Sequence, residues 1–441
     1  MVISGNKILI DSAERTNTNN LAPYHIYNGN LALASTVSTA GFSTTLYTGN
    51  GSTQSITTGV DMSTQWGNDA KETYGGLVWI KSRSYAGAWN TLIDTVRSGG
   101  LRIFTNDSIA QAVADGTTTP ITSTGFTHTS SSPGYNSSGD TYASWNFQTT
   151  HRRTGTTNHG QAFTEHYNPF TGFTIIQYTG SGIAGHEIPH SLGRKLGLWT
   201  YKNLTSANTD WVVFKDGNGY DYWFLNSTLA TQTAGGYFGN TESNVSMGTN
   251  SISGNASSNT YILYGWANSY FDEANTLIGN YEIGVYQGTG ASGNKVTTRG
   301  KPAWVMIKGI SATGNWAIHD NVRGINSYSL AANLSSADGS YNGVSVSSDG
   351  FIWLHFFLNY SVHMGVCLYS NNNNGKIWIN PINKSIDTSY IIGQVAIAQG
   401  GTNGTATPTA GAVAYGTGTA YGFTAAGTTG QFLQSNGSGT P

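Results

Sequence analysis

One phrase of strand-forming residues occurs three times along this chain and limits its fold more than any other feature. Each copy begins with the pattern Tyr-x-Gly-x-Gly, at Tyr47, Tyr178 and Tyr286. An apolar run that contains a Trp then ends in a Lys, at Lys81, Lys202 and Lys308. A second Trp follows that Lys after 8, 9 and 8 residues, at Trp89, Trp211 and Trp316. The distance from Tyr to Lys varies, at 34, 24 and 22 residues. Fixed strands with a variable connection are typical of one structural unit used in tandem.

The composition favours short strands joined by tight turns. Gly accounts for 58 of the 441 residues, charged residues for only 10% and aromatic residues for 12%. Because aromatic residues are abundant, the chain can bury cores despite its low charge. Its surface must then be rich in Ser, Thr, Asn and Gly, which suits strands and turns. Apolar residues at helical spacing are missing except for two weak candidates, at 108–113 and 274–278. The sequence therefore predicts an all-β protein.

Turn signals separate the strand candidates at intervals that suit a β-sandwich or jelly roll. We predict tandem β-sandwich, jelly-roll-like modules, each with a continuous apolar inner strand. Module 3 is expected to end on strands at 351–357 and 366–369. The predicted division of the chain is an N-terminal attachment arm (1–35), module 1 (36–150), a linker (151–171), module 2 (172–269), module 3 (270–378) and a Gly-rich C-terminal trimeric segment (379–441).

Charge and cysteine content exclude several classes of protein. The net charge of −2 offers no long-range attraction to phosphate, so we expect no nucleic-acid partner. The single cysteine, Cys367, cannot form an intrachain disulfide. No stretch approaches the roughly 18 apolar residues of a membrane span, so we expect no membrane insertion. The N-terminus shows no cleavage signal, so we expect synthesis in a host cytoplasm. A surface of extracellular type without an export signal is what a virus released by lysis produces.

From Ala396 the chain becomes a Gly, Thr and Ala tract with few large apolar side chains. A single copy of this tract cannot offset the entropy of its own ordering, about 1–2 kcal/mol per residue for the backbone. Other chains must supply the missing contacts. Three copies wound together would do so, and we therefore expect a homotrimer. The arm also has too few apolar residues for a core of its own, so we expect it to dock on another protein.

The C-terminal tract resembles a segment found in many bacteriophage tail fibres, where it precedes a trimeric shaft or tip. The residues that carry the resemblance are Gly400-Gly401-Thr402, the stretch 423–431 and the stretch 435–441. The three modules are similar to tandem β-sandwich modules of phage structural proteins. The resemblance implies a structural protein of the virion tail that serves host attachment and receptor binding. Its arm would bind other tail proteins, and a bacterial surface polysaccharide or another receptor would be its ligand. In such fibres the segment usually continues, so a longer protein is expected.

Two other functions remain open at this point. A polysaccharide depolymerase tailspike would be an enzyme, whereas a capsid decoration or head-fibre protein would differ in its place on the virion. The 22 acidic residues form no concentrated acidic cleft in the sequence, and Asp272-Glu273 lies in a connection between modules. Cys367 lies in an apolar run and is interpreted as a buried small hydrophobe. We therefore expect no enzymatic activity and predict no catalytic, cofactor-binding or metal-binding residue.

Two stretches are candidate ion-binding sites. His186-Glu187-Ile188-Pro189-His190 has the i to i+4 histidine spacing of a helical zinc site, but Gly185 and Pro189 exclude the helix. In a strand, His186, Ile188 and His190 share one face and Glu187 takes the other. The stretch 216–221 resembles the start of a calcium loop, yet its twelfth position is Ser227 rather than an acid. A hairpin explains that stretch better.

The Trp residues raise the possibility of carbohydrate binding, because sugars stack on aromatic faces. Trp79, Trp199 and Trp304 lie in apolar inner strands, so we predict that they pack in the core. The later Trp residues, at positions 89, 211 and 316, follow polar turns and could be half exposed. Their recurrence in all three copies favours a shared place in the core.

Overall fold

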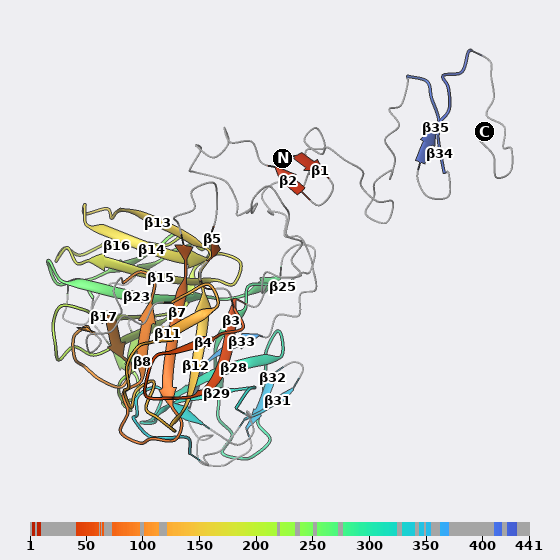
Figure 1. Cartoon of the computed structure of the whole chain (residues 1–441). Coiled ribbons are helices and arrows are strands. Elements are labelled where there is room, and N and C mark those ends of the chain that lie inside the picture. Colours follow the sequence, from red (N-terminus) through yellow and green to blue (C-terminus); the bar gives the residue numbers. More distant parts are fainter. Residues whose placement is uncertain are drawn as a thin grey trace. The chain divides into compact units, whose positions relative to one another are not determined.

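The computed structural model is all-β, and the part of the chain that it describes contains no helix (Figure 1). The described residues are 41–60, 75–97, 101–113, 121–217, 221–233, 239–249, 254–271, 277–323, 329–339, 344–347, 350–353 and 362–369, with the short segments 2–4, 7–9, 62, 64–65, 73–74, 410–416 and 421–429. The predicted class, tandem β-sandwich modules, is confirmed. Of the two weak helix candidates, one contains β10 (Ala112–Val113) and the other ends in β25 (Leu277–Ile278).

Each module contains one large antiparallel sheet and one small sheet. In module 1 the large sheet has the order β10-β9-β8-β7-β12-β3, and β11 pairs with β4 in the small sheet. The bounds are β3 Phe42–Thr48, β4 Gln54–Thr57, β7 Gly76–Ser82, β8 Thr91–Asp94, β9 Leu101–Phe104, β11 Gly125–His128 and β12 Thr141–Gln148. A further short pair joins β5 (Thr64–Gln65) to β6 (Thr73–Tyr74).

Module 2 repeats this arrangement with a larger sheet. Its sheet has the order β13-β14-β15-β23-β17-β18-β19-β20, and β16-β22-β21 forms the small sheet. The bounds are β13 His151–Thr156, β14 Ala162–Asn168, β15 Phe173–Thr179, β16 His186–Pro189, β17 Leu196–Asn203, β18 Val212–Lys215, β19 Asp221–Phe224, β20 Gln232–Thr233, β21 Gly239–Asn240, β22 Asn244–Met247 and β23 Thr260–Ala267.

Module 3 has the large sheet β26-β33-β28-β29-β30 and the small sheet β27-β32-β31. A short hairpin of β24 and β25 precedes it. The bounds are β24 Tyr270–Phe271, β26 Tyr281–Gln287, β27 Lys295–Thr297, β28 Pro302–Gly309, β29 Trp316–Asp320, β30 Leu330–Ala331, β31 Val344–Ser347, β32 Gly350–Trp353 and β33 Val362–Tyr369. The two late strands predicted for this module correspond to β32 and β33, although β33 begins earlier than the predicted strand.

The strand registers confirm that the repeated Tyr and Lys residues are equivalent. Each Tyr is the sixth residue of its strand and pairs with an aromatic residue of the closing strand: Tyr47 with Tyr142, Tyr178 with Tyr261, and Tyr286 with His363. The three ring pairs stack at centroid distances of 5.1, 5.3 and 5.2 Å. Each Lys pairs with the next residue of the same closing strand, namely Ala143, Ile262 and Met364. His363 thus takes the place of the closing Tyr in module 3.

The segment 151–171, predicted as a linker, carries two strands. These are β13 and β14, which extend the large sheet of module 2 at its edge. The fully buried carboxylate of Glu165 on β14 holds this addition in place. It pairs with Arg153 on β13 at 3.0 Å and accepts hydrogen bonds from Thr174 and Ser191. A strand that buries a charge lacks the simple alternation by which strands are recognised.

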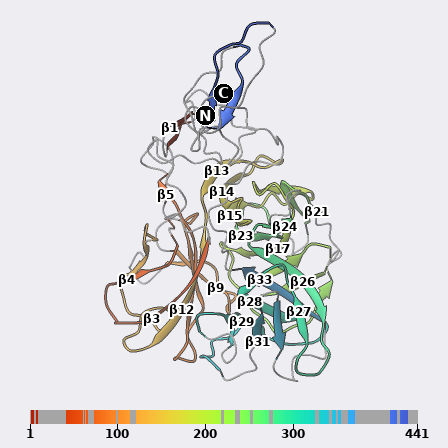
Figure 2. The same cartoon turned by 90° about the vertical axis from the view of Figure 1, so that its right-hand side faces the viewer.

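Strands of the three modules are labelled in Figure 2. Buried side chains from all three modules form one hydrophobic core. Trp79 and Trp145 of module 1 lie within 6.5 Å of Trp304 of module 3, and Phe147 lies 5.2 Å from Phe173 of module 2. The opposite face of each large sheet packs on its own small sheet, for example Val78 and Ile80 on Phe126. The inner strands are buried along their whole length for this reason. A void of about 10 Å³ in the shared core is too small for an ordered water.

The chain divides into two compact units, residues 37–376 and the two ends, 1–36 with 377–441. In the arm, β1 (Val2–Ser4) pairs with β2 (Lys7–Leu9). In the C-terminal segment, β34 (Ala414–Gly416) pairs with β35 (Tyr421–Phe423). Most of the predicted attachment arm and of the predicted trimeric segment lies outside the described residues.

Candidate functional site

The repeated Lys residues hold the modules to one another. Each is almost fully buried and donates to a backbone carbonyl of another module: Lys81 to Leu334, Lys202 to Ser108 and Lys308 to Thr228, at 2.7, 3.2 and 2.9 Å. Module 1 therefore contacts module 3, module 2 contacts module 1, and module 3 contacts module 2. These contacts form a closed ring. Burial lowers the pKa of the three ammonium groups to about 7, 8 and 8 respectively.

A second set of contacts follows the same ring. The indole N–H groups of Trp211 and Trp316 donate to the carbonyls of Phe104 and Phe224 in the preceding module, at 2.7 and 2.8 Å. In module 1 the donor is the side chain of Asn90, which reaches the carbonyl of Ala331 at 3.2 Å. The backbone N–H of these three donor residues also binds an equivalent Asn side chain, that of Asn106, Asn226 and Asn333.

This geometry corrects the predicted equivalence of the later Trp residues. Trp211 and Trp316 lie in the core, with 0% and 1% of their surface exposed. Their counterpart in module 1 is Asn90, because all three residues lie at the same place beside the repeated Lys and make the same contacts. Trp89 is displaced by one residue and is 48% exposed. By contrast, Trp79, Trp199 and Trp304 pack in the core as predicted.

Buried carboxylates reinforce two of the three junctions. Asp94 of module 1 pairs with Arg97 at 2.7 Å and accepts a hydrogen bond from Tyr264 of module 2 at 2.6 Å. Asp320 of module 3 pairs with Arg323 and accepts a hydrogen bond from the indole N–H of Trp145 of module 1. In module 2 the strand position equivalent to Asp94 and Asp320 is occupied by Lys215. The third junction has no acid in this register and combines its Lys and Trp contacts with hydrogen bonds from Thr231 to the carbonyl of Ile310 and from Gly314 to that of Thr228.

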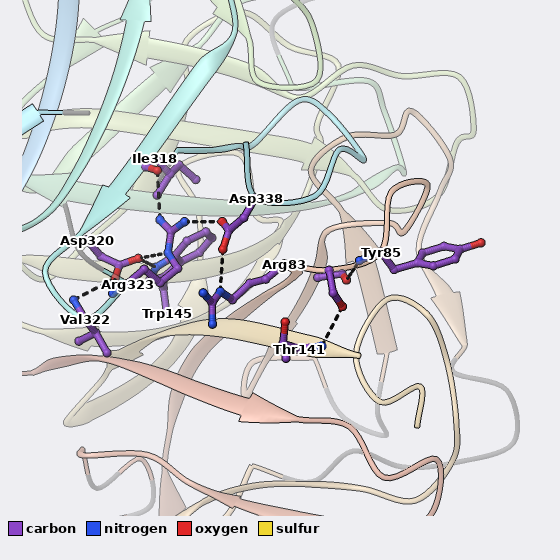
Figure 3. A network of polar contacts seen from close by, with 11 residues as sticks. Arg83, Tyr85, Thr141, Trp145, Ile318, Asp320, Val322, Arg323 and Asp338 are labelled. Atoms are coloured by element: carbon purple, nitrogen blue, oxygen red, sulfur yellow. Dashed lines mark hydrogen bonds and ion pairs between the residues drawn. The ribbon is translucent and has the colours of Figure 1, made fainter. Parts of the chain in front are cut away.

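The junction between modules 3 and 1 carries the largest polar network (Figure 3). Asp338 of module 3 binds Arg323 at 2.9 Å and Arg83 of module 1 at 2.7 Å. The backbone of the segment 83–89 is also fixed there, since the N–H of Asp338 donates to the carbonyl of Arg83 and the N–H of Gly87 to that of Ser335. Figure 3 shows the ring of Tyr85 pointing away from this network, and 45% of its surface is exposed.

A groove on module 1 begins at the exposed Trp89. Its indole lies against Phe104, with the ring centroids 4.7 Å apart, and the groove has a volume of about 260 Å³. The lining comes from the segment before β8, from β8 to β10 and from a turn before β12: Gly87, Ala88, Trp89, Thr91, Arg102, Phe104, Ala112, Ser132, Pro133, Gly134 and Tyr135. Among the described residues that line the groove, none carries a carboxylate.

The polar side chains of the lining are those of Thr91, Arg102, Ser132 and Tyr135. The hydroxyl of Thr91 is buried and has no hydrogen-bond partner. It lies under Gly134, where a Cβ atom would come within 3.1 Å of it and within 3.2 Å of the Trp89 carbonyl. Tyr135 is held from behind, because the guanidinium of Arg102 lies 3.8 Å from its ring centroid and His128 stacks on it at 4.8 Å. Burial lowers the pKa of His128 to about 3, so this stack stays uncharged at His128.

The stretches weighed as ion sites have structural roles. His186 and Ile188 are buried on one face of β16 and Glu187 is less buried, as predicted for a strand. Both ring nitrogens of His186 are engaged, by Asn255 at 2.7 Å and Thr157 at 2.8 Å. Among the described residues, no group of three His, Cys, Asp or Glu side chains could hold a metal ion.

The structure also describes the second candidate ion site and Cys367. The strands around the stretch 216–221 pair as an antiparallel hairpin, β18 with β19. Cys367 is buried, and burial raises the pKa of its thiol. Asp272-Glu273 lies outside the described residues. Within the described part of the chain, no helix is long and apolar enough to span a membrane.

Comparison with known proteins identifies the family. A model described as "Domain of unknown function (DUF7483)" matches residues 39–356. This chain belongs to the DUF7483 family. The DUF7483 match covers modules 1 and 2 and most of module 3, and it ends before β33, the closing strand of module 3. No curated protein and no solved structure matches the chain.

Proposed function

We propose that this chain is a structural protein of a bacteriophage virion, a tail fibre that is attached to the tail and serves host attachment. The observation that carries the proposal is the exposed aromatic groove of module 1 on a rigid scaffold of three β-modules. Buried ions, indoles and a common core lock those modules together, so the groove is held in one shape. A fixed site on a rigid β-scaffold suits recognition of a surface ligand.

The lining of the groove favours binding over cleavage. Glycoside hydrolysis requires a pair of carboxyl groups about 5–9.5 Å apart on either side of the scissile bond. The described residues of the groove's lining include no carboxylate. The buried acids Asp94, Glu165 and Asp320 each pair with an arginine. We therefore propose a non-enzymatic protein rather than a polysaccharide depolymerase tailspike. A capsid decoration or head-fibre protein is the remaining alternative, and it would use the same scaffold elsewhere on the virion.

The proposal includes partners for both ends of the chain. The C-terminal segment would join two other copies in a homotrimer, and the arm would dock on another tail protein. The low charge supports the absence of a nucleic-acid partner. The expected ligand is a bacterial surface polysaccharide or another receptor.

Labelling of intact particles tests the function. Antibodies raised against residues 37–376 would be coupled to gold and imaged on particles of the phage that encodes this chain. We expect the gold at the tail. Gold on the capsid would support the head-fibre alternative, and unlabelled particles that contain no copy of the chain by mass spectrometry would contradict a virion protein altogether.

A further inference from the structure

We propose that the groove beside Trp89 is a saccharide-binding site found only in module 1, in which one pyranose ring packs on the Trp89 indole. This inference rests on the proposed host-attachment function and names the ligand class that the groove takes. The inference starts from a difference between module 1 and the other two modules. Modules 2 and 3 each use a Trp to contact the preceding module, whereas module 1 uses Asn90 and its Trp89 is exposed at the surface.

Trp89 is exposed, whereas the corresponding Trp residues of the other two modules are buried. Trp211 and Trp316 are buried, and their N–H groups bind the preceding module. Asn90 makes the matching contact for module 1, with further bonds to the carbonyls of Ala332 and Leu334. Trp89 is thus released from the junction. An indole that is half exposed forgoes about half of the stabilisation of a buried one, so a ligand that covers it gains that contact.

Aromatic surface is concentrated at this place. Among the described residues the exposed large aromatic side chains are Tyr85, Trp89 and Tyr270, and two of these lie in the segment 83–89. A Cβ atom at Gly87, which lines the groove, would lie 3.7 Å from the ring of Tyr85. Tyr85 is not itself part of the lining, but its ring lies near Gly87, which is. Exposed aromatic rings close to a groove are typical of a contact surface for a ligand.

The chemistry of the groove fits a sugar. A pyranose ring has an apolar face of C–H groups, which packs on an aromatic face, and a rim of hydroxyls, which needs hydrogen-bond partners. The rim would meet Ser132 in the lining. It would reach the hydroxyl of Thr91, which has no partner among the described residues, after a small displacement of Gly134, because that hydroxyl is buried beneath Gly134. A buried polar group without a partner is rare in native structures and calls for an explanation. A hydroxylated ligand provides one.

The size and rigidity of the groove agree with a single ring. Its volume of about 260 Å³ falls just below the roughly 300–1,000 Å³ of sites for drug-sized ligands. Gly134 covers the Thr91 hydroxyl without a side chain, and a Cβ atom there would crowd that hydroxyl. The backbone bonds of Arg83 and Gly87 to module 3 hold the segment that carries Trp89. A preformed site loses little conformational entropy on binding.

Saturation-transfer NMR on the full-length protein tests the inference. The probes are the methyl pyranosides of glucose, galactose, mannose, N-acetylglucosamine and rhamnose, each at millimolar concentration. We expect transfer to at least one of them, strongest for the ring protons of one face. Trp89→Ala should weaken binding at least tenfold. Ile183→Ala is the matched control, because Ile183 is 54% exposed and lies on module 2. It should bind as the unmodified protein does.

A second variant separates binding from folding. Thr91→Val removes the hydroxyl that has no partner while it keeps the shape of the side chain. We expect an equal or higher melting temperature, because no protein hydrogen bond is lost, and roughly threefold to tenfold weaker binding of the same glycoside. If the melting temperature of Trp89→Ala equals that of the unmodified protein, the weaker binding of this variant results from the missing indole and not from unfolding.

The outcomes distinguish this inference from the proposed function. If the unmodified protein binds none of the five glycosides, or if Trp89→Ala binds as well as the unmodified protein, the saccharide site is wrong. Gold labelling at the tail would still leave the tail-fibre proposal standing. If glycoside binding depends on Trp89 and Thr91 but the particle lacks the chain, the site stands and the tail-fibre proposal fails.

Discussion

Asp320 offers the sharpest test of how the modules are held together. It is fully buried, pairs with Arg323 and accepts hydrogen bonds from Trp145 of module 1 and from the backbone of Val322 and Arg323. Asp320→Ala removes the charge partner of a buried guanidinium, and breaking a buried pair costs about 3–5 kcal/mol. Asp338 still binds Arg323, so we expect the lower part of that range.

This cost translates into a melting temperature. Unfolding of residues 37–376 has an entropy of roughly 0.7 kcal/mol/K, from about 2.1 cal/mol/K per residue. A loss of 3–5 kcal/mol then lowers the melting temperature by about 4–7 °C. Differential scanning calorimetry would measure it. The control Glu282→Gln weakens the surface pair with Arg299, worth at most about 1 kcal/mol, and should shift the transition by less than about 2 °C.

The double variant Asp320→Leu/Arg323→Met tests whether Asp320→Ala loses stability because it leaves the buried guanidinium of Arg323 without its charge partner. Replacing both members of a buried pair by apolar residues is often neutral or stabilising. We therefore expect the double variant to melt above Asp320→Ala. If Asp320→Ala melts within about 1 °C of the unmodified protein, or if the double variant melts below it, the junction does not depend on this buried charge pair.

Three further predictions concern Lys202, Trp304 and the C-terminal segment. The pKa of Lys202 is lowered to about 8 in the folded protein, so between about pH 8 and 10.5 the unfolded chain binds more protons and folding stability should rise with pH. Lys202→Met should flatten this rise in melting temperature, and equal slopes for both proteins would contradict the lowered pKa. Trp304→Ala should cost about 3–5 kcal/mol by denaturant unfolding, because the ring is buried where modules 1 and 3 meet, and a near-neutral result would argue that the ring faces a ligand. The full chain should have the mass of a homotrimer by light scattering, and a chain ending before Ala396 should associate less while its circular dichroism stays unchanged; a monomeric full chain would refute the trimer.

Local patterns in the sequence predicted the strands and the repeat. The Tyr and Lys residues are found at equivalent registers because each lies in a strand whose burial is continuous or alternating, and that pattern is visible over a few residues. The contacts of the Lys side chains were not predicted, since they join residues far apart, such as Lys81 and Leu334 at a separation of 253 residues. The motif Asp-x-Val-Arg at 94–97 and 320–323 was a signal that could have been read as a repeated buried pair.

The sequence did not predict the groove, because matching Trp89 with Trp211 and Trp316 by residue type gave the wrong alignment. The spacing of 8 residues from Lys81 to Trp89 matches that from Lys308 to Trp316, but Asn90 makes the contact. A one-residue change of spacing next to a turn does not show which side chain faces the junction. The Asn residues at 106, 226 and 333 would have shown it, since each binds the backbone of the contact residue.

The direction of the contacts explains why the phrase occurs three times. Each module donates its Lys to the preceding one, so every interface is head to tail, and head-to-tail interfaces give either a closed ring or an open array. Module 1 closes the ring on module 3 through Lys81 and Leu334. Removing or adding one module would leave a buried ammonium and its carbonyl partner apart, unlike in an open repeat array, where length varies freely. The number of modules is therefore fixed by closure, whereas the connection from Tyr to Lys lies outside these contacts and varies in length. Within a fixed ring, a residue freed from a junction, as Trp89 is by Asn90, can take a separate role without loss of the scaffold.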